Sequence, residues 1–296
     1  MKQLLVISGK GGTGKTSVTA GLASLAQPLA MADCDVDAAN LHLLAGDSIT
    51  DQHVQAFSGG SLAQVDPAGC IGCGLCAELC RFAAISLQNV DGRQVAVADP
   101  LGCEGCGVCI DHCPTMSINE VQRQVGQLID GNTARGPLIW GRLDPGQPNS
   151  GKLVERVRSR AKTIATQHEL ELVLVDGPPG IGCPVIAALS GIDLALIVAE
   201  PSASSLHDLS RVVELAKRFR TDCAVVINKA DLRESASQQI EAWCRKNDVP
   251  VLGRINYDRL FTEAACAGVS IPDLAPDSTA AGELANLWEQ ISSQLG

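Results

Sequence analysis

The sequence predicts an α/β protein with a doubly wound, mostly parallel sheet, into which a small α+β region is inserted. Two observations predict the large fold: short apolar runs alternate with helix-length segments, and each run has the apolar character of a buried central strand. A third observation predicts the insert, because eight of the thirteen cysteines fall in two tight groups between residues 70 and 113.

Six apolar runs are interpreted as strands: Gln3 to Ser8, Leu29 to Ala32, Leu172 to Val175, Leu194 to Ala199, Ala224 to Ile227 and Val251 to Ile255. Six intervening segments are interpreted as helices, at about residues 15–27, 150–167, 184–190, 203–219, 235–247 and 280–294. Asn149 and Ser202 have side chains that commonly cap the first turn of a helix. This order is typical of a sheet with helices on both faces.

The alternation is interrupted once, from about Phe57 to about Leu143. This interval has glycine-rich cysteine runs, polar/apolar alternation in SINEVQRQVGQLI and a predicted turn at Asp130-Gly131-Asn132, which together indicate short strands and hairpins. We therefore expect a first segment of the large domain at 1–56, an insert at 57–143 and a second segment of the large domain at 144–296.

Charge and hydropathy narrow the function classes. The net charge of -10 argues against non-specific nucleic-acid binding, which Lys and Arg supply by neutralising phosphates. No stretch of 18 apolar residues occurs, and Met1 leads into Leu4-Leu5-Val6-Ile7 without the features of a secretory leader. The sequence predicts a cytoplasmic protein with neither nucleic acid nor membrane as partner.

A phosphate-binding motif follows the first apolar run. Residues 9–16, GKGGTGKT, fit G-x-x-x-x-G-K-[ST] between a strand and a helix, the context of a P-loop NTPase. In this motif backbone N–H groups bind the phosphates, Lys15 reaches the β- and γ-phosphates, and the Thr16 hydroxyl ligates Mg²⁺. The predicted nucleotide-binding residues of this segment are Gly9, Lys10, Gly11, Gly12, Thr13, Gly14, Lys15, Thr16 and Ser17.

The additional lysine, Lys10, resembles the early lysine of the deviant Walker A motif in MinD/ParA-type ATPases. MADCDVDAANL, VLVDGPPGIG and VVINKAD resemble later motifs of that family, in the same order. The resemblance implies ATP/ADP and Mg²⁺ as ligands, an ATP-promoted homodimer, and a catalytic Lys10 that crosses to the partner's nucleotide beside the catalytic Lys15.

The resemblance of the later motifs implies roles for further residues. Asp33 is expected in the Mg²⁺ region, and Asp35 is expected to activate the attacking water as a catalytic residue. Asp176 is expected near Mg²⁺ through water, with Gly180 sensing the γ-phosphate and Asn228 on the adenine. Asp33 and Asp35 also have a plainer interpretation, as solvated carboxylates at strand ends.

The cysteine groups repeat C-x2-C-x2-C-x3-C, the bacterial ferredoxin run, in which three cysteines hold one 4Fe-4S cluster and the fourth ligates the other. A zinc site usually pairs two C-x2-C knuckles and has no place for the third cysteine. Pro114 closes the second run, whereas Arg81 follows the first. On the ferredoxin pattern, two clusters would be held by Cys70, Cys73, Cys76 and Cys113, and by Cys103, Cys106, Cys109 and Cys80.

The remaining cysteines carry weaker predictions. Cys183 follows Asp176 at a spacing that resembles that of the cysteine ligating the bridging cluster in the nitrogenase iron protein. No convincing second ligand is present in the sequence. A structural or redox role for Cys183 is therefore the alternative. Four scattered cysteines are interpreted as core residues: Cys34, Cys223, Cys244 and Cys266.

The whole order of motifs resembles MinD-superfamily ATPases with an inserted ferredoxin domain. The favoured function is an ATPase whose dimerisation drives electron transfer through two 4Fe-4S clusters to a redox protein partner. An iron-sulfur carrier is the first alternative, although the C-P-x-C pair of Mrp-like carriers is missing, since Cys183-Pro184 continues with Val185-Ile186. A MinD/ParA-like positioning switch is the second, but no Lys or Arg follows Arg259 to supply a basic membrane-binding tail.

Overall fold

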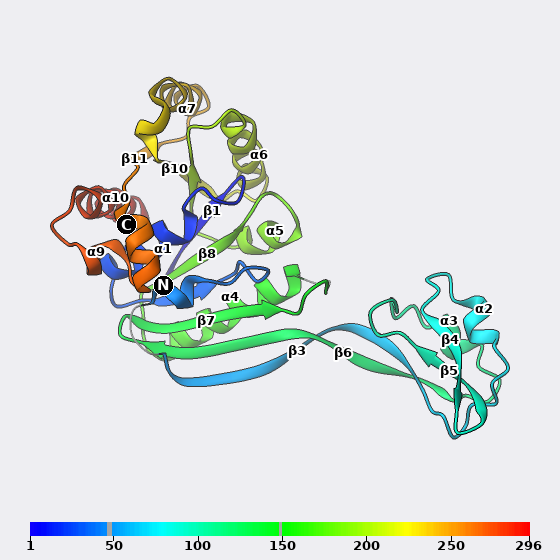
Figure 1. Cartoon of the computed structure of the whole chain (residues 1–296). Helices are drawn as coiled ribbons and strands as arrows, with labels where there is room; N and C mark the ends of the chain where they lie inside the picture. The colour runs from blue at the N-terminus through cyan, green and yellow to red at the C-terminus, as the bar shows by residue number, and fades with distance from the viewer. Residues whose placement is uncertain (46–48, 148–149) are drawn as a thin grey trace. The chain divides into compact units, whose positions relative to one another are not determined.

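The computed structural model describes residues 1–45, 49–147 and 150–296. The chain divides into two compact units (Figure 1). The larger unit comprises Met1–Gln55 and Gly126–Gly296, and the smaller unit comprises Ala56–Val125.

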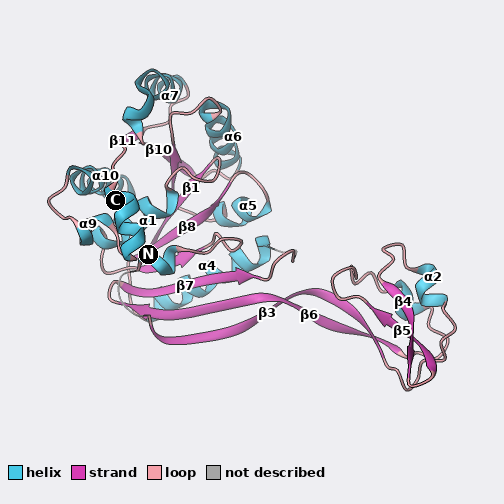
Figure 2. Ribbon diagram, in the orientation of Figure 1, coloured by secondary structure: helices cyan, strands magenta, loops and turns pink. Residues whose placement is uncertain are grey.

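A nine-stranded sheet has the order β11-β10-β9-β1-β8-β2-β7-β6-β3 (Figure 2). Its strands are β1 (Lys2–Ser8), β2 (Ala30–Asp33), β3 (Thr50–Val65), β6 (Ile118–Thr133), β7 (Gly136–Leu143), β8 (Leu172–Pro179), β9 (Leu194–Ala199), β10 (Asp222–Asn228) and β11 (Val251–Ile255). Every pair from β11 to β7 is parallel, and β7 pairs antiparallel with β6. The predicted α/β fold with a mostly parallel sheet is confirmed.

Each of the six apolar runs forms a strand of this sheet. Two of the predicted strands, Leu194 to Ala199 and Val251 to Ile255, have the same bounds in the structure. β8 continues beyond the predicted end to Pro179, because its last residues still pair with Ser8 of β1. The buried runs therefore identify the strands, and pairing partners set their ends.

The helices of the larger unit are α1 (Lys15–Leu25), α4 (Ser150–Gln167), α5 (Cys183–Leu189), α6 (Ser205–Arg218), α7 (Glu234–Lys246), α8 (Leu260–Ala267), α9 (Ile271–Leu274) and α10 (Thr279–Leu295), with 3-10 turns η1 (Leu41–Leu44) and η2 (Ala230–Arg233). The six predicted helices are present, whereas α8 and α9 were not predicted. Ser204 is the N-cap of α6, so the prediction for Ser202 is wrong. The predicted cap Asn149 lies outside the described residues.

The core of the larger unit lies on both faces of the sheet. Leu4 and Val6 of β1 belong to one buried cluster with Leu22 of α1 and Leu284 of α10. Side chains alternate along a strand, so Leu5 and the equally buried Ile7 face the opposite side, and α4 and α5 contact the sheet as well. Figure 2 shows helices on both sides of the strands. Because β1, β2, β8, β9 and β10 are parallel, the loops at their carboxyl ends lie along one edge of the sheet.

The predicted turn at residues 130–132 is wrong. Asp130 and Gly131 lie inside β6 and pair with Ile139 and Leu138 of β7, and the chain reverses after Thr133 instead. A β-carbon on Gly131 would lie 2.5 Å from Cγ2 of Ile49. The glycine therefore serves close approach of a neighbouring segment within the sheet, a signal that resembles a turn in sequence.

The smaller unit is an α+β arrangement around the cysteine runs. Antiparallel β4 (Ile85–Val90) and β5 (Arg93–Ala98) form a two-stranded sheet, with short helices α2 (Leu75–Leu79) and α3 (Val108–Asp111). β3 and β6 run from one unit into the other. The unit is shorter than the predicted insert, because β7 and the end of β6 join the large sheet beside β2.

The scattered cysteines divide by burial. Cys34 and Cys244 are buried and Cys223 is half-buried, whereas Cys266 is exposed on α8, so its prediction as a core residue is wrong. Cys183 is exposed at the first position of α5. Among the described helices, none combines the length and the apolar character that crossing a bilayer requires.

Candidate functional site

The P-loop, residues 9–14, joins β1 to the first turn of α1 at the carboxyl edge of the sheet. The 11-residue α1 directs its free N–H groups toward this loop, an arrangement suited to phosphate. Lys15 and Thr16 lie on the first turn of α1, and Ser17 follows them. The strand, loop and helix that the motif requires are therefore all present.

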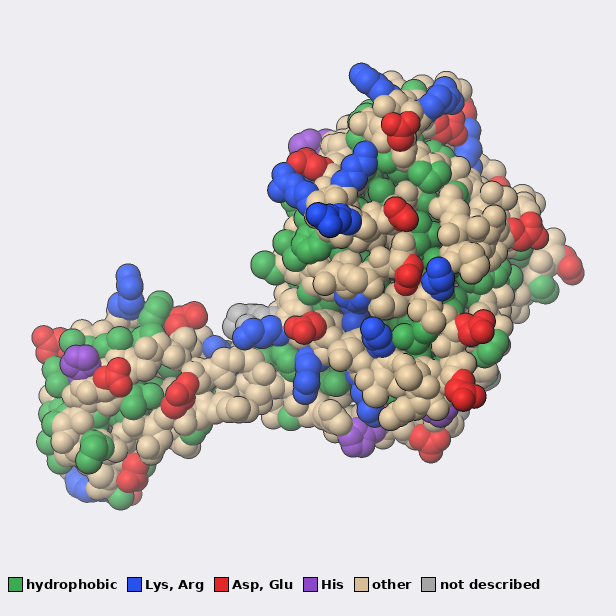
Figure 3. All heavy atoms as spheres, turned by 180° about the vertical axis from the view of Figure 1, so that it is seen from behind, with side chains coloured by type: hydrophobic (Ala, Val, Ile, Leu, Met, Phe, Trp, Pro, Cys, Tyr) green, Lys and Arg blue, Asp and Glu red, His purple; other side chains and the backbone are tan. Residues whose placement is uncertain are grey.

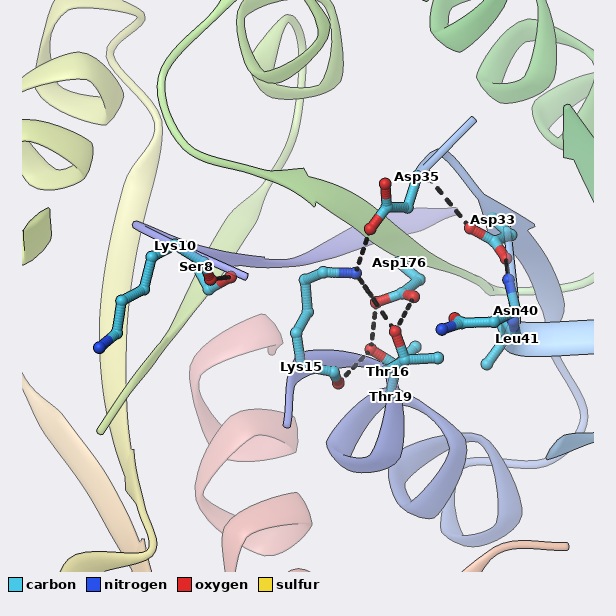
Figure 4. Close-up of polar contacts among 10 residues, drawn as sticks. All are labelled: Ser8, Lys10, Lys15, Thr16, Thr19, Asp33, Asp35, Asn40, Leu41 and Asp176. Carbon is cyan, nitrogen blue, oxygen red and sulfur yellow. Dashed lines mark hydrogen bonds and ion pairs between the residues drawn. The ribbon is translucent and has the colours of Figure 1, made fainter. Parts of the chain in front are cut away.

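Lys15 lies in a buried ion-pair network with two carboxylates (Figure 4). Its Nζ is 2.9 Å from Oδ1 of Asp176 and 3.6 Å from Oδ2 of Asp35. Asp176 also accepts hydrogen bonds from the hydroxyl groups of Thr16, at 2.8 Å, and Thr19, at 2.9 Å. Burial alone would lower the pKa of Lys15, but Asp176 and Asp35 outweigh it and the pKa is raised. An ammonium group, two hydroxyls and two carboxylates thus meet beside the P-loop.

Asp33, at the end of β2, forms hydrogen bonds through its side chain with the main chain of the loop that follows it. Its carboxylate accepts the N–H groups of Asp35 at 3.1 Å, Asn40 at 2.9 Å and Leu41 at 2.9 Å. Burial and the neighbouring Asp176, its register partner on β8, raise the pKa of Asp33 to about 7. Asp33 therefore fixes the loop that carries Asp35, and its predicted place in the Mg²⁺ region stays a prediction.

Lys10 belongs to a second network on the other side of the P-loop. In Figure 4 its side chain extends away from Lys15 and Asp176. Its Nζ is 2.7 Å from Oε1 of Glu200 and donates to Oγ of Ser202 at 2.7 Å. The other oxygen of Glu200 is 3.1 Å from Nζ of Lys229, which also donates to the carbonyl of Gly12 at 2.9 Å.

Glu200 and Lys229 were not predicted from the sequence. A signal was available, because Glu200 comes directly after the fully apolar strand β9, and Lys229 comes directly after β10, at the edge where the P-loop lies. Both lysines lower the pKa of the Glu200 carboxyl, although its partial burial opposes them. Glu200 thereby joins the P-loop to the loops after β9 and β10.

Two further predicted nucleotide residues lie against the P-loop or the strand before it. Gly180 donates its N–H to the carbonyl of Ser8 at 2.8 Å. Asn228 is buried and donates from Nδ2 to the carbonyl of Thr13 at 2.7 Å. Asn228 therefore supports the loop from behind, and its predicted contact with adenine stays a prediction.

The two cysteine runs adopt the same backbone conformation. Gly72 and Gly105, each between the first two cysteines of its run, have φ of 67° and 64°. A β-carbon on Gly72 would lie 2.4 Å from the carbonyl oxygen of Gln94, and one on Gly105 would lie 2.4 Å from that of Ser61. Only glycine fits such turns, which bring the following cysteines round toward the first.

Main-chain hydrogen bonds cross between the two runs. The segment that precedes the first run bonds to the segment that follows the second run, since Asp66 N–H donates to Ser117 O at 2.7 Å. The segment that precedes the second run bonds to the segment that follows the first run, since Asp99 N–H donates to Ala84 O at 2.7 Å. Each run therefore lies beside the last cysteine of the other run. This is the arrangement that shared ligation of two clusters requires.

The repeat is longer than the cysteine spacing indicates. Asp-Pro-x-Gly precedes each run, at residues 66–69 and 99–102. Asp66 and Asp99 each accept, through Oδ1, the N–H two residues later, at 3.0 Å. This element of the repeat is visible in the sequence, although the prediction of the clusters did not depend on it.

Four cysteines line one pocket of the smaller unit: Cys80, Cys103, Cys106 and Cys109. They are the set predicted for the second cluster. Phe82 and Val108 line the same pocket. The N–H of Ala84 points to Sγ of Cys80 at 3.3 Å, and the N–H of Ala96 points to Sγ of Cys70 at 3.5 Å. Donors of this kind stabilise thiolate ligands.

No three Asp, Glu, His or Cys side chains converge on a single metal position in the part of the chain that the structure describes. Four cysteines of a cubane bind four different iron atoms, so their sulfur atoms surround a cluster and do not meet at one point. The crossed runs and the pocket fit clusters of this kind.

The surface of the smaller unit is acidic and apolar. Figure 3 shows hydrophobic and acidic side chains intermingled on the drawn face of this unit. Three of its apolar side chains are strongly exposed: Ile71 at 67%, Leu101 at 74% and Met116 at 85%.

Comparisons with known proteins agree with the fold and the P-loop. A family model, the CobQ/CobB/MinD/ParA nucleotide binding domain, matches residues 4–271. A Methanocaldococcus jannaschii protein of unassigned function is 35% identical over 230 residues, 77% of this chain and 78% of that protein. The Pyrococcus furiosus iron-sulfur cluster carrier protein is 22% identical over 312 residues, 99% of this chain and 86% of that protein.

A similar solved structure is the septum site-determining protein MinD complexed with Mg-ADP from Pyrococcus horikoshii. It has a TM-score of 0.59 and 19% identity, covering 100% of this chain and 97% of that chain. At this identity the likeness is one of fold.

Proposed function

Because this chain belongs to the MinD/ParA family of P-loop ATPases, we propose that it hydrolyses ATP to drive electron transfer through two 4Fe-4S clusters in its smaller unit. The observation that carries this proposal is the pair of crossed cysteine runs, which gathers Cys103, Cys106 and Cys109 of one run around a pocket with Cys80 of the other. An ATPase domain and a two-cluster unit in one chain supply the two parts of a nucleotide-driven redox protein.

The nucleotide would bind on the P-loop with Mg²⁺. Lys15 holds the β- and γ-phosphates and exchanges its bond to Asp176 for the phosphate oxygens. The Thr16 hydroxyl and, through water, Asp176, whose oxygens are 2.8 Å apart, would hold Mg²⁺, which would neutralise charge on the phosphates. Asp35 accepts the proton of the attacking water, as a bond forms from water oxygen to the γ-phosphorus and the bond to the ADP oxygen breaks. Burial raises the pKa of Asp35, although Lys15 opposes the shift, and this favours proton acceptance.

The active form would be an ATP-promoted homodimer. By resemblance to the family, Lys10 contacts the nucleotide of the partner subunit. In the present structure Lys10 is paired with Glu200 of its own chain at 2.7 Å. Dimerisation therefore includes an exchange of ionic partners at Lys10, which links the dimer interface to the loop after β9.

Two four-cysteine sets would hold the clusters and supply one-electron chemistry. The chain contributes the thiolates, the N–H groups directed at Cys70 and Cys80, and an apolar surround that includes Phe82. The exposed apolar side chains Ile71, Leu101 and Met116 offer a surface for a redox protein partner. The nucleotide cycle would reach this unit through β3 and β6, the two strands that lead into it.

A second candidate function is iron-sulfur cluster delivery. It is favoured by relatives named iron-sulfur cluster carrier protein, which align with 99% of this chain in the Pyrococcus furiosus case. It is weakened by the sequence after Cys183, which lacks the C-P-x-C pair of the Mrp-like carriers. The two candidates differ in whether the iron stays on the chain.

The test measures ATP hydrolysis by anaerobically purified protein with its clusters reduced and oxidised, and counts iron before and after turnover. Electron transfer is supported if the rate depends on redox state and about eight irons per chain remain, as two 4Fe-4S clusters require. Delivery is supported if iron moves to an apo-acceptor during turnover. A redox-independent rate with all iron retained contradicts both.

A further inference from the structure

The smaller unit contains one buried arginine that none of the predicted sites explains. Arg123 lies on β6 and is 8% exposed. Its Nη2 donates to the carbonyl of Pro100 at 2.7 Å and its Nη1 to the carbonyl of Cys103 at 3.3 Å. Both of these partners are neutral, and no described Asp or Glu forms an ion pair with the guanidinium.

A buried guanidinium without a counter-charge is costly, because arginine stays protonated in proteins and its hydration is lost. The cost falls if an anion is bound nearby. Arg123 contacts the main chain of Cys103, the first predicted ligand of the second cluster. A four-thiolate 4Fe-4S cluster supplies negative charge, and reduction adds one more. A cluster held by Cys103 would therefore supply a counter-charge close to Arg123.

No buried charge equivalent to Arg123 lies beside the cysteines predicted for the first cluster, among the described residues. The two runs are offset by 33 residues, so the position that corresponds to Arg123 in the first repeat is Val90. The nearest counterpart is Arg93, which approaches the carbonyl of Pro67, the proline equivalent to Pro100. That contact is longer, at 3.5 Å, and Arg93 is exposed. Water screens an exposed charge, whereas a buried one acts at nearly full strength.

Other local features do not offset this difference. Each cysteine set receives a main-chain N–H, at Cys70 and at Cys80, over similar distances. Glu104 and Glu120 line the pocket of the second set, but both are exposed and therefore screened. In the first set, the Cys113 thiol also contacts the hydroxyl groups of Ser117 at 3.5 Å and Thr115 at 3.6 Å, which carry no net charge. Arg123 is the buried charge that distinguishes the two surroundings.

We propose that Arg123 holds the reduction potential of the cluster at Cys80, Cys103, Cys106 and Cys109 above that of the cluster at Cys70, Cys73, Cys76 and Cys113. A fixed positive charge stabilises the reduced, more negative state. An electron that enters the smaller unit therefore rests on the second cluster, next to Arg123. This inference rests on the proposed presence of two 4Fe-4S clusters.

The test is a dithionite titration of the anaerobic, iron-loaded full chain, followed by electron paramagnetic resonance. The wild type is expected to show two one-electron steps at different potentials. Arg123→Gln, which keeps a hydrogen-bond donor and removes the charge, should lower the upper step, leave the lower step in place and narrow the gap. Arg93→Gln is the matched control and should move neither step.

The inference is overturned if Arg123→Gln leaves both steps unchanged, moves them equally, or lowers only the lower one. If that variant loses iron, Arg123→Lys keeps the charge without the paired hydrogen bonds: a retained gap supports the inference, and a closed gap overturns it. Iron content separates this result from the proposed function. A wild-type chain that binds about four irons or fewer contradicts the two-cluster proposal itself.

Discussion

The larger and the smaller units hold their sites in different ways. Near the P-loop, the side chains predicted to bind nucleotide already have partners within the chain: Lys15 pairs with Asp176, Lys10 pairs with Glu200, and Asp33 accepts main-chain N–H groups of the loop that follows it. They stand on a sheet with an extensive buried core. The smaller unit has a described core of only a few buried side chains, and three of those are cysteines: Ala63, Cys76, Ala84, Ile85, Ala96, Cys103, Cys109 and Ile118.

This difference implies that the two units depend on their ligands for folding to different extents. A unit of about 70 residues buries too little apolar surface to be robust alone, and small domains of this kind commonly depend on metal. The residues around the P-loop stand on a large packed fold, whereas three of the cysteines proposed as cluster ligands form part of the small core of their own unit. Four experiments test this contrast, and iron removal should have the greatest effect.

Removal of iron should unfold the smaller unit and leave the larger one intact. Cluster binding and folding are coupled when the ligands are also the core, so hydrogen exchange protection in residues 56–125 should be lost on chelation. Protection in β1, β8 and β9 should persist. Cys266→Ser, at an exposed cysteine of the larger unit, is the control and should change neither. Retained protection throughout residues 56–125 would contradict the contrast.

Lys15→Ala should weaken ATP binding by about 100-fold, since charged hydrogen bonds to phosphate contribute about 1.5–3 kcal/mol each. It should leave the iron content unchanged, because the cysteine runs make their contacts within the smaller unit. Calorimetry and iron analysis on the same sample would measure both. Lys2→Ala, at an exposed lysine, is the control. Loss of iron in Lys15→Ala would show that the two units do not assemble independently.

Gly105→Ala should impair cluster assembly through backbone strain. The residue has φ of 64° and its new β-carbon would lie 2.4 Å from the carbonyl of Ser61, so we expect a cost of about 2 kcal/mol or more. Gly107→Ala is the matched control, since it has a similar positive φ of 80° but no atom within 4 Å of the added carbon. Equal iron content in the two variants would show that the contact with Ser61 is unimportant.

Glu200→Gln should destabilise the larger unit by about 1 kcal/mol, since it leaves Lys10 and Lys229 near each other without their shared carboxylate. Urea denaturation monitored in the larger unit would measure this effect. Glu214→Gln removes an exposed ion pair with Arg218 and should have no measurable effect. A loss of stability in Glu214→Gln as large as that in Glu200→Gln would contradict the importance of the network around Lys10.

The strands, the principal helices and the P-loop could be predicted because their signals are local. A buried run such as Leu194 to Ala199 identifies a strand whatever its neighbours. Glycine at 131 resembles a turn residue in sequence because its reason, the close approach of Ile49, comes from a distant part of the chain. The position of Glu200 after an apolar strand is visible in the sequence, but its pairing with Lys10 is not, since Lys10 lies 190 residues earlier.

The cysteine spacing predicts which thiols belong together, and the structure adds how the chain arranges them. The crossed bonds at Asp66 and Asp99 and the burial of Arg123 depend on tertiary packing that spacing does not encode. The Asp-Pro-x-Gly element is visible in the sequence. The asymmetry between Arg123 and Val90 is visible there as well, but only burial gives it meaning.

The order of strands has a consequence for how such a chain could be rebuilt. β3 and β6, through which the chain leaves the larger unit and returns to it, are neighbours at one edge of the sheet. The chain therefore leaves the larger unit and returns to it on adjacent strands, so the segment between them is attached to the sheet at a single position. A different module, of any size whose ends lie a strand spacing apart, could be exchanged there without altering the register of the remaining strands. The nucleotide-binding fold and the cysteine-rich unit could in this sense have been joined, and could be exchanged, as separate parts.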